Sequence, residues 1–146
     1  MAIRADRDLQ RALIVTRKVV TGAVAVGMPV KDGSNDHEVQ PCADGVGMIG
    51  VVIALGTGYK VSGGAPGGIN DEVQIAYLGA PLIIPVKVGT GGATRGLYAK
   101  VVADGFTNAT ETVTTPVAMN VAGFFTQSGS AGDIVGLIPS RSWLTE

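Results

Sequence analysis

The stretch Met48-Ile49-Gly50-Val51-Val52-Ile53-Ala54-Leu55 constrains the fold more than any other part of this sequence. It is apolar apart from one glycine and rich in β-branched side chains. Gly45 and Gly47 precede it, and Gly56 and Gly58 follow it. A short apolar run between turn residues is too short for a typical buried helix and suits a buried strand. We therefore predict a central strand here.

A looser version of this stretch returns late in the chain as Val121-Ala122-Gly123-Phe124-Phe125, which we also predict to be a core strand. Both follow an Asp-Gly turn, Asp32-Gly33 or Asp104-Gly105, and both lead to an acidic turn and a last strand. One interpretation is an internal duplication that relates about residues 20–78 to 88–138. The other is that these are ordinary turns between strands, because Asp-Gly turns are common in β proteins.

The composition agrees with a β protein. The chain has 22 dispersed glycines and is 46% hydrophobic, but only 16% of its residues are charged, below the roughly 25% of ordinary soluble domains. Its length of 146 residues fits one domain. We predict an all-β fold, a compact β-barrel or β-sandwich over residues 19–146, after an extended N-terminal arm at 1–18. So few charges indicate a surface covered by partners, such as subunits of an oligomer.

Further strands are expected from apolar alternation and turn residues. A short strand is expected before Gly27, and residues 140–146 are expected to be a short tail. The other predicted strands cover about residues 12–20, 28–31, 38–43, 72–78, 82–88, 97–103 and 132–138.

The first 18 residues hold five of the eleven basic residues. They are either a solvated terminal segment or an arm that docks on a partner and orders there. Trp143, near the other end, either anchors a partner or packs on its own domain. The candidate partner-contact residues are Arg4, Arg7, Leu9, Arg11, Leu13 and Trp143.

Residues that could support catalysis are few. His37 and Cys42 are close in sequence and contain the elements of a thiol nucleophile. Their segment is polar and loop-like, so we predict a protein that is not an enzyme. Gly89–Gly92 is not followed by Gly-Lys-Ser/Thr or by a helix pattern, so we predict a hairpin turn rather than a phosphate site.

The acidic stretch around Asp32, Asn35, Asp36 and Glu38 has oxygen ligands that could suit Ca²⁺. The spacing of an EF-hand is not met, and Asp and Asn commonly cap turns. Whether Asp32, Asp36 and Glu38 bind a cation stays open at this point, and we expect no cofactor.

Charge and hydropathy limit the partners. The net charge is −1, which gives no general attraction to nucleic acid or to anionic membranes. The sequence has no uncharged apolar run of 18 residues and no apolar core of signal-peptide length near Met1. We expect a chain made in the cytoplasm, without nucleic acid or membrane as a partner.

Three segments resemble a known family: Val26-Gly27-Met28-Pro29-Val30 with the preceding Val20-Thr21-Gly22, Ile49-Gly50-Val51-Val52, and Asp71-Glu72-Val73-Gln74-Ile75. Together they are similar to the capsid decoration, or cement, proteins of tailed bacteriophages, over most of residues 20–138. Two departures are a longer loop at Gly56–Asn70 and a second half that does not match residue by residue.

The resemblance implies a compact β-barrel or β-sandwich, commonly a homotrimer, on the exterior of the virion. It implies binding to the outer surface of the expanded capsid, where the protein clamps neighbouring major capsid subunits. The N-terminal arm is then the expected contact with a capsid subunit. Three other classes remain. The first is a tail or baseplate structural protein, and the second is a carbohydrate-binding β module, which the few aromatic residues disfavour. A small hydrolase comes last.

Overall fold

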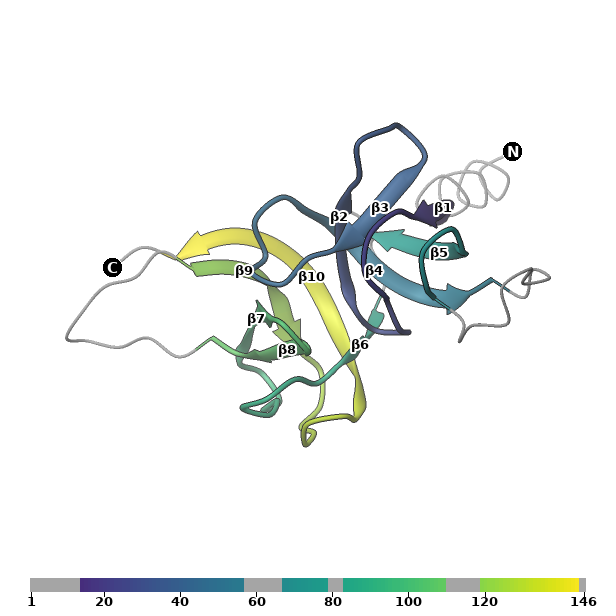
Figure 1. Cartoon of the computed structure of the whole chain (residues 1–146). Coiled ribbons are helices and arrows are strands. Elements are labelled where there is room, and N and C mark those ends of the chain that lie inside the picture. Colours follow the sequence, from purple (N-terminus) through teal and green to yellow (C-terminus); the bar gives the residue numbers. More distant parts are fainter. Residues whose placement is uncertain (1–13, 57–66, 79–82, 110–118, 145–146) are drawn as a thin grey trace, which may run out of the picture.

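The computed structural model describes residues 14–56, 67–78, 83–109 and 119–144, with side-chain surroundings given only up to residue 139 and not for 119–120. This part of the chain is all-β and contains no helix (Figure 1). The predicted fold class is therefore confirmed. The strands are β1 (Ile14–Val19), β2 (Pro29–Asp32), β3 (Glu38–Pro41), β4 (Met48–Leu55), β5 (Glu72–Tyr77), β6 (Ile84–Lys87), β7 (Tyr98–Val102), β8 (Gly105–Asn108), β9 (Met119–Phe125) and β10 (Ile134–Leu144).

The first five strands form a closed barrel in the order β1-β3-β2-β4-β5, which we call the first unit. β1 and β3 run parallel, and the other four pairings are antiparallel. Val19, Val30, Val39, Val52 and Val73 are fully buried in one hydrophobic cluster. Small β-branched side chains suit this interior because they pack well on a pleated surface and fill a narrow barrel.

The central strand has the predicted bounds, Met48–Leu55, and it lies between two cores. Successive side chains of a strand point to opposite faces. Val52 therefore packs inside the first barrel, while Val51 belongs to a second cluster that holds the core of β6–β10. Burial on both faces explains why β4 is a continuous apolar run rather than an alternating one.

The last five strands form a sheet in the order β6-β10-β9-β7-β8, which we call the second unit. An isolated parallel bridge between Val88 and Phe106 joins its two edges, just after β6 and within β8. Each pairing of the first unit thus has a counterpart of the same direction in the second, with β6 to β10 in the places of β1 to β5.

The registers of the two units also correspond. Gly50 pairs with Val30, and Gly123 pairs with Ala99; a register shift follows one residue later in both pairs of strands. The Gly27 N–H donates to the Val52 carbonyl at 2.7 Å, and the N–H of Gly96 donates to the Phe125 carbonyl at 2.8 Å. This repeated pattern supports the internal duplication, which stays a prediction about how the chain arose.

The turns before the last strand of each unit are built alike. Asn70 and Gly132 both have positive φ, 70° and 95°. The Asn70 N–H donates to the Val19 carbonyl, and the Gly132 N–H donates to the Val88 carbonyl. Asn and Gly are the residues that adopt this left-handed conformation most readily, so both turns are encoded locally.

The strand predicted over about residues 12–20 is confirmed as β1, which pairs with β5, so residues 14–18 belong to this strand rather than to the arm that we predicted at residues 1–18. Two other expectations about local structure were wrong. Residues 23–26 form no strand. Residues 140–144, assigned to the tail, continue β10, because a register shift after Pro139 accommodates the proline and lets pairing with β9 resume at Ser142.

Candidate interaction surface

The predicted partner contacts lie mainly outside the part that the structure describes. This applies to Arg4, Arg7, Leu9, Arg11 and Leu13. Trp143 lies in β10, where its backbone pairs with Asn120, but the structure does not describe its side chain. The arm and Trp143 therefore stay predictions.

His37 and Cys42 have different environments. His37 is exposed at the β2–β3 hairpin, and its carbonyl accepts the Lys18 N–H. Cys42 is buried, with its Sγ 3.6 Å from the Val46 carbonyl oxygen and 3.9 Å from the Asp44 carboxylate. Burial, rather than any charge, is the main reason that the pKa of the thiol is raised. A raised pKa keeps the sulfur protonated and weakly nucleophilic, which suits a packing residue.

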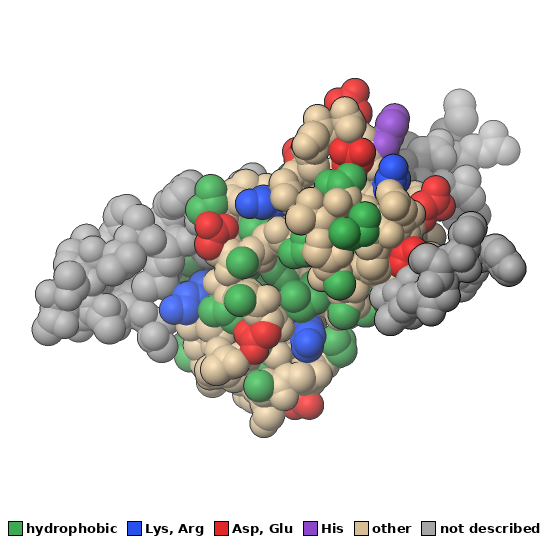
Figure 2. All heavy atoms as spheres, in the orientation of Figure 1, with side chains coloured by type: hydrophobic (Ala, Val, Ile, Leu, Met, Phe, Trp, Pro, Cys, Tyr) green, Lys and Arg blue, Asp and Glu red, His purple; other side chains and the backbone are tan. Residues whose placement is uncertain are grey.

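The acidic side chains of the β2–β3 hairpin organise its loop. The Glu38 carboxylate accepts hydrogen bonds from the Asn35 N–H at 3.1 Å and from the Asn35 side-chain amide at 2.8 Å. Among the described residues, no three His, Cys, Asp or Glu side chains are grouped so that they could hold a metal ion. Figure 2 shows acidic side chains near the histidine at one end of the molecule.

The Gly89–Gly92 loop holds a carboxylate from its own chain. The Asp104 carboxylate accepts the Thr90 N–H at 3.0 Å and the Thr90 hydroxyl at 2.7 Å. These two hydrogen bonds are the main reason that the pKa of Asp104 is lowered. The loop donors that could cradle an anion are thus used to fix the turn between β7 and β8.

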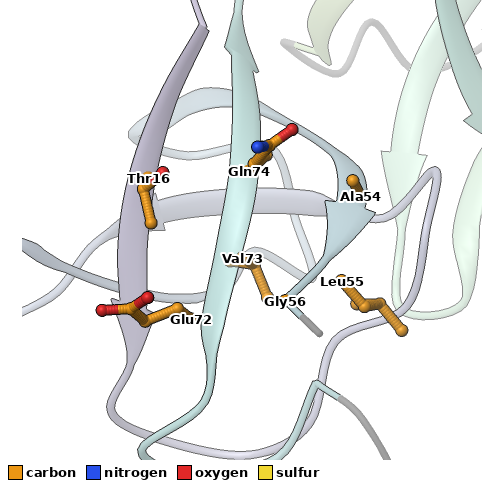
Figure 3. Close-up of a pocket in the computed structure, with 7 residues that line it drawn as sticks. All are labelled: Thr16, Ala54, Leu55, Gly56, Glu72, Val73 and Gln74. Carbon is orange, nitrogen blue, oxygen red and sulfur yellow. The ribbon is translucent and has the colours of Figure 1, made fainter. Parts of the chain in front are cut away.

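A surface pocket of about 490 Å³ lies beside the β1, β4 and β5 strands of the first unit (Figure 3). Among the described residues that line it, Glu72 is the only titratable one. The lining residues are Thr16, Ala54, Leu55, Gly56, Glu72, Val73 and Gln74. One carboxylate beside a threonine and a glutamine offers hydrogen bonds but no pair of groups for acid–base chemistry.

A second hollow, of about 240 Å³, lies where the two units meet. Its walls are almost wholly apolar and come from β1, β4 and β5 of one unit and from β6 of the other. The lining residues are Ile14, Ile53, Ala76, Ile83, Ile84 and Pro85. Ile83, at its rim, is 64% exposed.

An apolar row crosses the outside of the second unit. Tyr98 on β7 pairs with Phe124 on β9, which pairs with Ile138 on β10. We call these three residues the outer row. The Tyr98 and Phe124 rings meet edge to face with centroids 5.9 Å apart. Tyr98 is 44% exposed and Ile138 is 40% exposed.

Sequence reasoning missed the outer row, because it placed Phe124 and Phe125 together in a core strand. Adjacent residues of a strand point to opposite faces, so only one of them can enter one core. Phe125 is fully buried, and Phe124 points outward to Tyr98. Strict alternation applied to β9 could have found this surface.

The charges are nearly balanced within each half of the chain. Residues 1–78, which include the first unit, hold seven basic and eight acidic residues, and residues 79–146, which include the second, hold four of each. Net charge therefore does not distinguish the two units.

Comparison with known proteins finds no family model that matches this chain and no curated protein that is significantly similar to it. None of the described residues belongs to a helix long and apolar enough to cross a membrane.

Proposed function

We propose that this protein is a structural subunit of a tailed-bacteriophage virion. It binds the outer surface of the expanded capsid and clamps neighbouring major capsid subunits, which stabilises the shell. In this proposal it acts as a homotrimer on the capsid exterior, needs no cofactor and catalyses no reaction.

One observation carries this proposal. The three segments that resemble decoration proteins lie on or directly before β2, β4 and β5, which are adjacent strands of one closed barrel. The resemblance therefore maps to one contiguous folded unit rather than to scattered turns. The second unit repeats the same strand pairing, so one chain contains two units of this kind.

The physical requirements of a decoration protein are modest, and a protein built from these two units meets them. A ligand that binds only the assembled shell stabilises it by mass action. Several linked copies bind with avidity, so each contact can be weak. A stiff β scaffold with exposed apolar side chains suits this task, and the described residues do not bring together a group of side chains for catalysis or metal binding.

The proposal is tested by mixing the purified protein with undecorated expanded capsids of its own virus, sedimenting them and imaging the pellet by electron microscopy. We expect added density on the outside of the shell and a higher melting temperature of the decorated particles. Unexpanded shells, in which the capsid subunits are arranged differently, provide the control.

Shells that stay bare at saturating protein would refute the decoration function. Rings or tubes formed by the protein in place of shell binding would instead favour a tail or baseplate component.

A further inference from the structure

The two units are closed differently. In the first unit, β1 and β3 pair in parallel over two positions, residues 18–19 with residues 38–39. In the described part of the second unit, the corresponding edges are joined by one parallel bridge, between Val88 and Phe106. We call this closure, between residues 87–94 and β8, the seam.

The two closures can be compared bond by bond. The Val20 N–H donates to the Val39 carbonyl at 3.0 Å, just after β1. The Gly89 N–H donates to the Phe106 carbonyl at 2.8 Å, just after β6. Gly89 is therefore the counterpart of Val20, and Phe106 is the counterpart of Val39.

A backbone donor that extends the first closure has another partner in the second unit. Lys18 and Lys87 lie two residues before the counterparts Val20 and Gly89. The Lys18 N–H donates to the His37 carbonyl at 2.9 Å, within the closure of the first unit. The Lys87 N–H donates instead to the carbonyl of Gly27 in the first unit, at 3.0 Å. The contact between the units thus uses a donor that would otherwise extend the seam.

Side chains hold much of the rest of the seam. The Thr107 hydroxyl donates to the Gly92 carbonyl at 2.9 Å, and the Asn108 side-chain oxygen accepts the Thr94 N–H at 2.8 Å. The Asp104 carboxylate, described above, spans the same gap. Thr94 and Asp104 are exposed, so water competes for their hydrogen bonds and weakens this closure.

The hydrophobic core lies directly behind the seam, and each side of the seam is anchored separately. Val88 and Phe106 are fully buried in the cluster of the second unit. β8 pairs with β7. The segment opposite is held by hydrogen bonds from the Val88 N–H to the Asp133 carbonyl and from the Ala93 N–H to the Gly129 carbonyl, 2.8 and 2.9 Å long. The two sides can therefore part without the loss of any strand pairing around them.

We propose that the second unit opens along the seam while its other strand pairings stay formed and the first unit stays closed. The opening is local, and it needs less free energy than the unfolding of the whole chain. It exposes two strand edges and the part of the core behind them. This opening depends on the chain alone, and it does not rest on the capsid-binding function.

Native-state hydrogen exchange, followed for each amide by NMR spectroscopy, tests the opening. In the unaltered chain, the Gly89 amide is compared with that of its counterpart Val20. After correction for intrinsic rates, we expect Gly89 to exchange at least about tenfold faster, although it is the more buried of the two residues. Its rate should respond little to low concentrations of urea, because a local opening exposes little surface.

Thr107→Val removes the hydroxyl bond across the seam and nearly preserves the size of the side chain. We expect it to raise the exchange rate of the Gly89 amide at least about threefold, because the closed seam loses one hydrogen bond. Circular dichroism confirms that the variant is folded.

Thr126→Val is the matched control. It removes the same kind of bond in the same unit, from the Thr126 hydroxyl to the Gly136 carbonyl at 3.1 Å, beside the pairing of β9 with β10. This pairing stays formed when the seam opens. The exchange rate of the Gly89 amide should therefore equal that of the unaltered chain, even if the variant is less stable overall.

Two results would overturn the proposal. The first is a Gly89 amide that is protected as strongly as the Val20 amide, or that exchanges with the same dependence on urea. The second is a Gly89 exchange rate that is the same in Thr107→Val as in Thr126→Val. The comparison of Gly89 with Val20 uses the unaltered chain, so it decides the question even if a variant does not fold.

Discussion

At the residue scale, the glycines of the two central strands mark places where backbones meet. A Cβ at Gly123 would lie against the Ile138 carbonyl, and a Cβ at Gly50 would lie against the Ala76 carbonyl. The strands of each unit are therefore held at a distance that only glycine permits. This explains the one glycine within each apolar run, which the sequence shows but does not account for.

Gly123→Ala should destabilise the fold by about 3 kcal/mol, because a clash with backbone adds to the strain of a φ of 154°. Gly96→Ala is the matched control, since its φ is 81° but its Cβ would meet open space. It should cost only about 1–2 kcal/mol. Urea denaturation gives both free energies of unfolding. An equal decrease in the two variants would show that the close approach to the Ile138 carbonyl does not contribute to the cost of Gly123→Ala.

Thr90→Val should lower stability in a pH-dependent way. The Thr90 hydrogen bonds lower the pKa of Asp104, so their stabilisation is present above the unfolded pKa of about 3.9 and is lost as pH falls through the folded pKa. The deficit of Thr90→Val relative to the unaltered chain should therefore shrink as pH falls below about 4.

Thr94→Val serves as the comparison, because Thr94 accepts a hydrogen bond from the uncharged amide of Asn108. Its effect in urea denaturation should not vary over the same acidic range. A Thr90→Val deficit that is equally constant would contradict the assigned role of the Asp104 carboxylate.

At the element scale, β4 joins the two hydrophobic cores. Val52 contributes to one cluster and Val51 to the other, so neither core is complete without this strand. We infer that the two units unfold together although their strands form separate sheets.

Val52→Ala tests this coupling. Removing buried methyl groups from the first unit should cost about 2 kcal/mol. Trp143, the only tryptophan, lies in β10 of the second unit. The transitions seen by tryptophan fluorescence and by far-UV circular dichroism should therefore shift together.

Phe125→Ala, at the counterpart position of the second unit, should lower stability by about 3–5 kcal/mol and again shift both signals. Two separated transitions in either variant would show that the units are independent.

At the scale of the whole molecule, the remaining question is which part meets the shell. Removing residues 2–13 spares β1, which begins at Ile14. We expect the midpoint of unfolding to stay the same and the affinity for expanded capsids to fall, because the predicted arm with Arg4, Arg7 and Arg11 is lost. Co-sedimentation over a range of protein concentrations measures the change. An unaltered affinity would remove the arm from the proposal.

Much of the fold was predictable, because its signals are local. The bounds of β4 follow from an apolar run between glycines, and the start of β5 follows from its acidic turn. The strand over about residues 12–20 was also predicted, although its residues up to 18 were assigned to the arm as well. The end of β10 was missed, because Pro139 suggests the end of a strand and only the register shift after it lets the pairing with β9 continue.

The candidate surface was less predictable. The sequence indicated an apolar, sparsely charged exterior, but it did not distinguish Phe124 from Phe125. That distinction needs the pairing of β9 with β7 and β10, which joins residues far apart in the chain.

The sequence by itself determined that this chain is a β protein, where most of its strands lie, and that two similar runs of strands follow one another. Alternation, β-branching and turn residues act over a few positions, so their effect does not depend on contacts with distant segments. Only the tertiary structure decided that the first run closes into a barrel and that one of two equivalent faces is buried while the other stays partly exposed. Those outcomes depend on contacts between distant segments. The sequence of a strand shows which side chains share a face, but it does not show which segment will pack against that face.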